Sequence, residues 1–280
     1  MSFLATTMHD TKRSMDVRMQ LAVLSEIPEK WEKALKTWSK LNQKHKTDVF
    51  PDANAEYFLY QILLGAWPSR PSFKRMWEAF QKSIREARTY TSWRHPDPTY
   101  ENACKKFLQA ILKKGNPFLK SFEKFQREIV ECGEWNALSA LALKLGGPGI
   151  VDVYQGCENW RYSLVDPDNR RPVDYSRKET LKVELHRQAL HFRKKHKALF
   201  LEGKYIPLEI TGPKKEHVIA YLRTYGKQSC LVAGVRFFTS IKTLKGTKIL
   251  LPKKQCPFEG SILSAEELFK NTPFSWIFWE

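Results

Sequence analysis

Residues 146–175 read GGPGIVDVYQGCENWRYSLVDPDNRRPVDY, and the rest of the chain is organised around this stretch. A short apolar run, Ile150–Tyr154, follows glycines and leads into a segment dense in Asp, Pro, Asn and Arg. This pattern predicts a buried strand that runs into a long loop rich in turns. Carboxylates accept hydrogen bonds from sugar hydroxyls, arginines donate to them, and aromatic rings cover the apolar face of a sugar. The loop therefore indicates carbohydrate binding, and the alternative is an ordinary solvated loop after a core strand.

A second strand is predicted near the start of the chain, where Phe3–Thr7 is short, apolar and β-prone. It leads directly into the run MHDTKR at residues 8–13. Barrel enzymes keep their chemistry at the carboxyl ends of the strands, so charged residues in this place indicate a site. Taken alone, His9-Asp10 is a weak signal, because an Asp at this point is commonly only the N-cap of a helix.

Both stretches resemble the maltooligosyltrehalose synthases, a family of the alpha-amylase superfamily. FLATTMHDTKRSMDVR (residues 3–18) is similar to the family's seventh barrel strand, and DVYQG (152–156) with SLVDPDNRRPVD (163–174) to the eighth strand and its loop. EYFLYQILLGAWP (56–68) is similar to a further family segment, as is TSW (91–93) followed by Pro96 and Tyr100-Glu101. Val151, Cys157, Asn159 and Arg161 depart from the family pattern.

The resemblance implies an activity and a set of site residues. The family moves the reducing-end glucose of a maltooligosaccharide from an α-1,4 to an α,α-1,1 bond within one molecule. Asp10 would be the catalytic carboxylate that stabilises the transition state, His9 a ligand of a sugar hydroxyl, and Lys12 and Arg13 contacts of the reducing-end glucose. The other substrate-binding residues that the resemblance implies are Tyr154, Gln155, Glu158, Asp168, Asn169, Arg170 and Arg171.

The expected fold class is α/β with an all-β C-terminal domain. By resemblance, residues 1–197 are the C-terminal part of a catalytic (β/α)8 barrel with strands seven and eight and a helical insertion at about 30–140. Apolar periods predict helices over residues 17–38, 57–64, 73–84, 100–111, 118–129, 135–145 and 177–196, with Gly133 as one of the breakers. Residues 198–280 are expected to form a small antiparallel β-sandwich, from β-rich runs at 204–208, 217–225, 228–237, 247–251 and 274–279.

The resemblance leaves part of the chemistry without a counterpart in this chain. The family's nucleophile and its acid/base come from barrel strands four and five, and no residue here matches either. A (β/α)8 barrel needs about 250 residues for itself. We therefore expect a C-terminal portion that is inactive alone, either a piece of a longer chain or one half of a split enzyme whose partner is a separate N-terminal fragment with strands one to six. The alternative is a non-catalytic glucan-binding remnant or a subunit of a split enzyme. No cofactor is expected.

The strongly basic composition raises a nucleic-acid hypothesis. The chain has 47 Lys and Arg against 30 Asp and Glu, a formal net charge of +17. Because many lysines alternate with glutamates along predicted helices and no nucleic-acid motif is present, we expect no specific nucleic-acid partner. The sequence has no long apolar run and no apolar leader, so we expect no membrane partner. We expect a cytoplasmic location for the same reason. The five cysteines are widely spaced in the sequence, so we expect reduced thiols and no zinc site. They are Cys104, Cys132, Cys157, Cys230 and Cys256.

Overall fold

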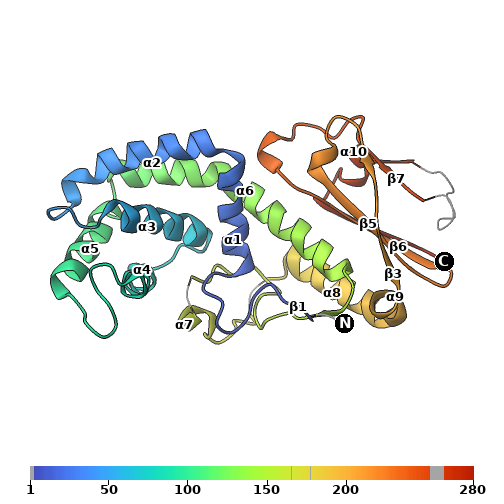
Figure 1. Ribbon diagram of the computed structural model, residues 1–280, viewed down its shortest axis with the longest axis horizontal. Coiled ribbons are helices and arrows are strands. Elements are labelled where there is room, and N and C mark those ends of the chain that lie inside the picture. The colour runs from blue at the N-terminus through green and yellow to red at the C-terminus, as the bar shows by residue number, and fades with distance from the viewer. Residues whose placement is uncertain (1–2, 165, 177, 253–261) are drawn as a thin grey trace. The chain divides into compact units, whose positions relative to one another are not determined.

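The computed structural model describes residues 3–164, 166–176, 178–252 and 262–280 (Figure 1). The chain forms two compact units, each with its own residues from distant parts of the sequence. The helical unit consists of Asp10–Glu131 and Tyr162–Arg170. The sheet unit consists of Met1–His9, Cys132–Arg161 and Arg171–Glu280.

The helical unit is built from capped, amphipathic helices. Asp52, Ser72 and Asp97 each accept a backbone hydrogen bond at a helix start, which satisfies amides that have no partner in the first turn. Pro28 and Pro98 begin two helices, where the fixed φ of proline suits the first turn. The elements are α1 (Met15–Ala22), η1 (Val23–Glu26), α2 (Pro28–Asn42), η2 (Gln43–His45), α3 (Ala53–Ala66), η3 (Trp67–Ser69), α4 (Phe73–Ala87), α5 (Pro98–Ile111), the first half of α6 (Pro117–Gly146) and α7 (Asp166–Asn169).

Aromatic side chains fill the core of the helical unit. Trp38 is fully buried, and its ring lies 5.5 Å from Tyr60 and 5.6 Å from Phe118. Helices α1 and α3 pack closely at Gly65, where an added Cβ would lie 2.5 Å from Cγ1 of Val17. The aromatic stripes of the sequence are therefore core residues, as their helical spacing predicts.

The predicted helix break at Gly133 is wrong, because Pro117–Gly146 is a single helix of 30 residues. A glycine inside a helix costs about 1 kcal/mol relative to alanine, which is a small term beside packing. Phe118, Phe122 and Ile129 are buried before the glycine, and Leu138 and Leu141 are buried after it. Burial on both sides outweighs the local preference of the glycine, so the helix continues through it.

The sheet unit contains a pair of parallel strands and two antiparallel sheets. β1 (Phe3–Leu4) pairs with β2 (Ile150–Val151) in parallel, with Phe3 opposite Ile150 and Leu4 opposite Val151. The four-stranded sheet has the order β3-β5-β6-β9 and the three-stranded sheet the order β4-β7-β8. Their bounds are β3 (Lys204–Pro207), β4 (Ile210–Thr211), β5 (Val218–Tyr225), β6 (Gln228–Val235), β7 (Lys248–Leu250), β8 (Ile262–Ser264) and β9 (Phe274–Trp279).

The remaining elements of the sheet unit are helical. They are the second half of α6, α8 (Leu181–Lys195), α9 (Lys197–Leu201), η4 (Lys215–His217), η5 (Phe238–Ser240) and α10 (Ala265–Leu268). The helix predicted from residue 177 begins four residues later in the structure, and Arg177 itself lies outside the described residues.

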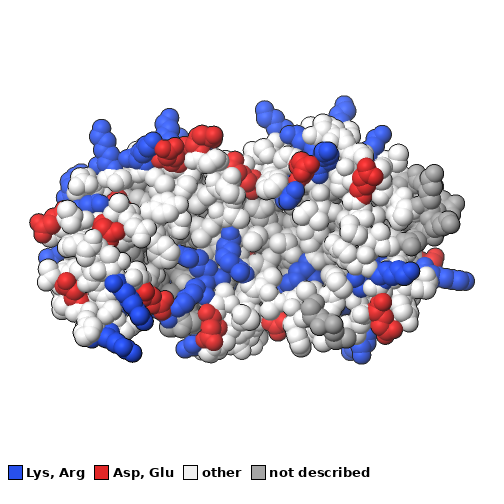
Figure 2. All heavy atoms as spheres, in the orientation of Figure 1, with Lys and Arg blue, Asp and Glu red and all other residues white. Residues whose placement is uncertain are grey.

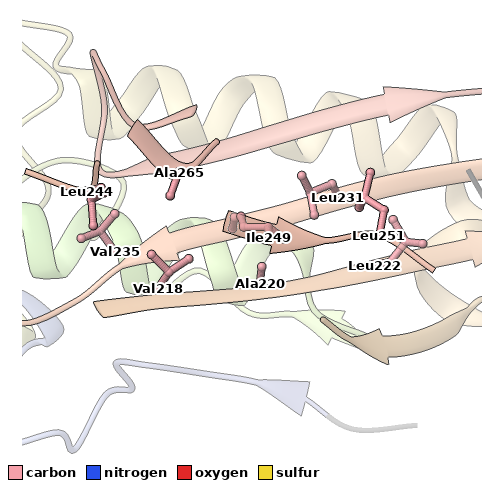
Figure 3. Close-up of a cluster of buried hydrophobic side chains, with 10 residues drawn as sticks. Val218, Ala220, Leu222, Leu231, Val235, Leu244, Ile249, Leu251 and Ala265 are labelled. Atoms are coloured by element: carbon pink, nitrogen blue, oxygen red, sulfur yellow. The ribbon is translucent and has the colours of Figure 1, made fainter. Parts of the chain in front are cut away.

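The two antiparallel sheets share one apolar core. Val218 and Leu231 of the four-stranded sheet belong to the same buried cluster as Ile249 of β7 (Figure 3). The other face of the four-stranded sheet is covered too, since Leu143 of α6 and Phe192 of α8 pack on a cluster that includes Tyr221 and Val232. All five β-rich runs predicted from the sequence form strands, whereas β4 and β8 are additional short strands.

A half-buried arginine fixes the turn that leads into β2. Arg193 of α8 donates hydrogen bonds to the carbonyl oxygens of Leu145 at 2.7 Å and Gly147 at 2.8 Å, and also to that of Gly149. Its guanidinium lies 4.5 Å from the centroid of the Phe200 ring. Burial lowers the pKa of Arg193 to about 10. The glycine-rich segment before β2 is thus held from helix α8.

Candidate functional site

Asp10 and Arg170 form an ion pair in the helical unit, although 160 residues separate them in sequence. Nη2 of Arg170 donates to Oδ1 of Asp10 at 2.8 Å. The Asp10 side chain is 78% exposed and that of Arg170 is 45% exposed, so a ligand can reach both. The contact limits the rotation of an exposed carboxylate. The structure therefore brings together two residues that the sequence assigned to one site.

Lys12 and Arg13 are held by side chains from two different helices. Nζ of Lys12 lies 2.9 Å from both carboxylate oxygens of Glu86, near the end of α4. The guanidinium of Arg13 lies 4.7 Å from the centroid of the Phe58 ring of α3, and burial lowers the pKa of Arg13. Sequence reasoning did not find Glu86 or Phe58, because both lie inside ordinary amphipathic helices.

Asp168 and Asn169 are buried, unlike Arg170 beside them. Nε of Arg75 lies 2.9 Å from Oδ1 of Asp168, and Nη2 of Arg75 lies 2.7 Å from Oδ2. The same carboxylate accepts a hydrogen bond from the backbone N–H of Leu164 at 3.1 Å. Arg75 also donates to the carbonyl oxygen of Tyr162. These bonds indicate that Asp168 shapes the loop that presents Arg170, and its predicted contact with sugar stays a prediction.

Arg75, Arg85 and Glu86 all belong to helix α4, and each side chain holds a different segment of the helical unit. Arg75 near the start of the helix holds the loop at 162–168, and Glu86 near its end holds Lys12. With a rise of 1.5 Å per residue, these two points lie about 16 Å apart along the helix. Helix α4 therefore positions two of the predicted site residues of this unit, Lys12 and Asp168.

In the sheet unit, Arg161 folds back over the loop that follows β2. Its Nη1 donates to the carbonyl oxygen of Gln155 at 3.0 Å, and its guanidinium lies 6.0 Å from the centroid of the Tyr154 ring. Gly156 has a φ of 77°, and a Cβ there would lie 2.3 Å from Nη1 of Arg161. The positive φ favours glycine at this position, whereas the guanidinium of Arg161 is the end of a flexible side chain and could move aside.

Helix α8 holds the next part of the same loop. Nζ of the buried Lys182 donates to the carbonyl oxygen of Asn159 at 3.1 Å and lies 5.2 Å from the centroid of the Trp160 ring. Oγ1 of Thr180 donates to Oδ1 of Asn159 at 3.1 Å. Of the remaining predicted ligands in this unit, His9, Gln155 and Arg171 are exposed, and Tyr154 and Glu158 are half-buried.

The residues that the structure describes contain neither a metal-binding cluster nor a helix that could cross a membrane. Residues 3–164, 166–176, 178–252 and 262–280 contain no group of three or more His, Cys, Asp or Glu side chains placed to hold a metal ion. No helix in the same ranges has the length and apolar character that a membrane crossing requires. Cys104, Cys132, Cys157 and Cys230 are free thiols, and Cys256 lies outside the described residues.

Comparison with known proteins gives relatives named as maltooligosyltrehalose synthases. A Mycobacterium tuberculosis H37Rv protein named "Putative maltooligosyl trehalose synthase" is 36% identical over 256 residues, which cover 87% of this chain and 32% of that protein. The structure of maltooligosyltrehalose synthase from Arthrobacter ramosus matches with a TM-score of 0.84 and 27% identity, over 98% of this chain and 38% of that chain. This chain is homologous to a C-terminal portion of the maltooligosyltrehalose synthases.

A third relative has a similar name. The crystal structure of a Sulfolobus tokodaii "hypothetical maltooligosyl trehalose synthase" matches with a TM-score of 0.73 and 33% identity, over 84% of this chain and 33% of that chain. The chain thus spans about a third of the length of the relatives that it matches. No family model matches the chain.

Two positions that depart from the maltooligosyltrehalose synthase pattern have structural roles in this chain. Arg161 donates to Gln155, and Asn159 donates through Nδ2 to the carbonyl oxygen of Lys178 at 3.0 Å. The first contact joins two parts of the loop after β2, and the second joins this loop to the segment before α8. The departures therefore supply internal contacts of the loop.

Proposed function

We propose that the chain is the part of a maltooligosyltrehalose synthase that supplies the transition-state carboxylate and ligands for the reducing-end glucose. The reaction would be an intramolecular transfer, an isomerisation that converts a terminal α-1,4 glucosidic bond into the α,α-1,1 bond of trehalose. The observation that carries the proposal is the exposed Asp10–Arg170 ion pair, which presents a carboxylate in a fixed orientation.

Each residue of the helical unit has a distinct part in this proposal. The carboxylate of Asp10 orients sugar hydroxyls and favours the positive charge that develops on the ring in an oxocarbenium-like transition state. Arg170 donates to Asp10 and favours one orientation of its carboxylate, which lowers the reorganisation needed during the reaction. Lys12, held by Glu86, contacts the released glucose and keeps it in place until it is attached again.

The covalent step requires groups that this proposal places on barrel strands outside these 280 residues. A retaining mechanism needs a nucleophilic carboxylate and an acid/base carboxyl group about 5 Å apart. The exposed parallel strands support a partner of this kind. Phe3 is 77% exposed and its register partner Ile150 is 40% exposed, whereas parallel sheets are normally covered on both faces. A fragment with barrel strands one to six would cover them.

Complementation tests the proposed function. The 280-residue chain is mixed with a fragment of a relative that carries strands one to six, and trehalose-linked product from maltopentaose is measured. We expect activity only in the mixture, and Asp10→Asn should lower kcat at least about 100-fold, as for the loss of one preorganised electrostatic group. Lys12→Ala should shift the product from the trehalose linkage toward free glucose, because a weakly held glucose escapes.

The control is Lys36→Ala, which removes an equally basic side chain that is 74% exposed on α2. It should leave the product ratio unchanged. Full activity of Asp10→Asn in the mixture would contradict the proposal. Glucan binding by the chain without any trehalose formation in the mixture would instead favour the alternative, a non-catalytic glucan-binding protein.

A further inference from the structure

Trp93 is a large aromatic side chain that is 58% exposed on the loop between α4 and α5. Single exposed apolar residues are common on protein surfaces, so exposure alone indicates nothing. What distinguishes Trp93 is the support beneath it. The guanidinium of Arg85 lies 4.8 Å from the centroid of its ring.

Arg85 is itself fixed by a nearly buried carboxylate. Its Nε and Nη2 each donate to Glu101 of α5 at 2.7 Å, one to each carboxylate oxygen. Gln81 donates to the same carboxylate at 2.8 Å and Thr91 donates at 2.7 Å. The hydrogen bond from Arg85 is the largest of the effects that lower the pKa of Glu101 to about 2. Four hydrogen bonds from three side chains therefore fix the Glu101 carboxylate, and the two from Arg85 hold the guanidinium that supports the indole.

The loop that carries Trp93 is also fixed by its own hydrogen bonds. The backbone N–H of Asp97 donates to Oγ1 of Thr91 at 3.0 Å. The N–H of Ser92 donates to the carbonyl oxygen of His95 at 3.1 Å, and the N–H of His95 donates back to Oγ of Ser92 at 2.9 Å. Trp93 thus lies in a short turn with little freedom, and a rigid aromatic surface loses little entropy when a ligand covers it.

The position of Trp93 relates it to the proposed site. Glu86, which holds Lys12, directly follows Arg85 in helix α4. The same helix end therefore supports both a predicted glucose ligand and the exposed indole. We propose that Trp93 is a stacking subsite for a glucosyl ring of a maltooligosaccharide, outside the subsite of Asp10. The apolar face of the sugar covers the indole, and Arg85 keeps the ring in place from behind.

The inference rests on the proposed function, because the ligand class is taken from it. A subsite away from Asp10 adds binding only for a chain long enough to reach it. Maltoheptaose should therefore bind the 280-residue chain more tightly than maltotriose does. Trp93→Ala should abolish this difference and weaken maltoheptaose binding about tenfold, as expected for the loss of one aromatic contact.

Isothermal titration calorimetry with maltotriose and maltoheptaose measures this effect, with the unfolding midpoint of each variant as a check on folding. Trp135→Ala is the matched control, because Trp135 is 41% exposed in the sheet unit and has no such support. Trp93→Tyr should restore most of the affinity, since a flat ring remains. Equal binding of maltoheptaose by parent and Trp93→Ala, or no binding by the parent, would overturn the inference.

The outcomes for the subsite and for the proposed function are distinguishable. If the complemented mixture forms trehalose and Trp93→Ala binds maltoheptaose as the parent does, the proposed function stands and the Trp93 subsite is contradicted. Trp93-dependent binding of maltoheptaose without trehalose formation would leave the subsite and remove the function.

Discussion

At the scale of single residues, the site depends on ion pairs that differ greatly in burial. The Arg75 and Asp168 side chains are 16% and 5% exposed, whereas Arg70, which pairs with Glu123, is 68% exposed. Exposed ion pairs contribute little because water and salt screen them, at a typical value of 0–1 kcal/mol. Removing one partner of a buried pair leaves an uncompensated charge, which costs about 3–5 kcal/mol.

Arg75→Ala should therefore lower the free energy of unfolding by about 3–5 kcal/mol, because Asp168 stays buried without its cation. Arg70→Ala is the control and should cost about 0–1 kcal/mol. Urea unfolding followed by circular dichroism measures both. If the two variants were equally stable, Asp168 would not need Arg75, and the loop before Arg170 would be held by other contacts.

At the scale of elements, the sequence predicted most helices and strands, and the exceptions have physical causes. Periodicity located α2 to α5 and five strands of the sheet unit, β3, β5, β6, β7 and β9. β4 has two residues, which is too short for an alternating pattern to be recognised. The sequence did not predict β8 either, which has three residues, as β7 does. The break at Gly133 was wrong because a local preference of about 1 kcal/mol does not decide a helix that packs on both sides.

The candidate site was predicted only in part, for a related reason. The resemblance indicated Asp10 and Arg170, and the structure joins them. It did not indicate Arg75, Glu86 or Arg161, since a charged residue on a helix or in a loop has no local feature that identifies its partner. The contacts of Arg75 and Glu86 depend on how helix α4 packs against loops 70 or more residues away in sequence, as for Lys12 and Glu86, which are 74 residues apart.

The stability contributed by helix α8 should depend on pH. His186 is buried on the face that holds the loop after β2, and its Nδ1–H donates to the carbonyl oxygen of Lys182 at 2.9 Å. The pKa of His186 is lowered to about 4, chiefly by burial and also by the charges of Lys182 and Lys144, while hydrogen bonds to the backbone of Lys182 and Glu158 oppose this shift. The neutral imidazole is therefore the form that the folded protein keeps.

Between pH 6.5 and 4, the unfolded chain binds a proton at His186 that the folded chain does not bind. Stability should therefore be complete above about pH 6.5 and fall as the pH is lowered toward 4. A pKa difference of about 2.5 corresponds to roughly 3 kcal/mol. His186→Gln should remove most of this loss in urea unfolding at pH 7, 5.5 and 4.5. His191→Gln, an exposed histidine of the same helix, is the control and should behave like the parent.

At the scale of the whole molecule, the high net charge does not gather into one patch on the face shown in Figure 2. Lys and Arg side chains there are interspersed with Asp and Glu over both helices and sheets. Exposed pairs of opposite charge, such as Lys36 with Glu32 on α2, follow the same pattern. This arrangement on the face shown is typical of a solvated surface, and the absence of a specific nucleic-acid partner stays a prediction.

The division of the chain into domains is the other question at this scale. The sequence places a boundary between residues 197 and 198, and this boundary stays a prediction. The core shared by the two antiparallel sheets lies wholly within 198–280. The opposite face of the four-stranded sheet depends on residues before 198, because the Phe192 ring lies 5.0 Å from that of Phe278, and Tyr221 donates to the carbonyl oxygen of Leu143 at 2.5 Å.

A fragment of residues 198–280 should therefore keep its inner core but expose an apolar sheet face formed by Tyr221, Val232, Trp276 and Phe278. Large exposed apolar patches drive association, so we expect this fragment to bind a hydrophobic dye and to self-associate with increasing concentration. Trp276→Lys with Phe278→Lys should restore a monomer in the fragment, because the uncovered face becomes polar. The same double substitution should destabilise the 280-residue chain, where Phe192 contacts both rings. Sedimentation and thermal unfolding measure these opposite effects. A monomeric, cooperatively melting fragment without any substitution would show that the face needs no cover and that residue 198 begins an independent domain.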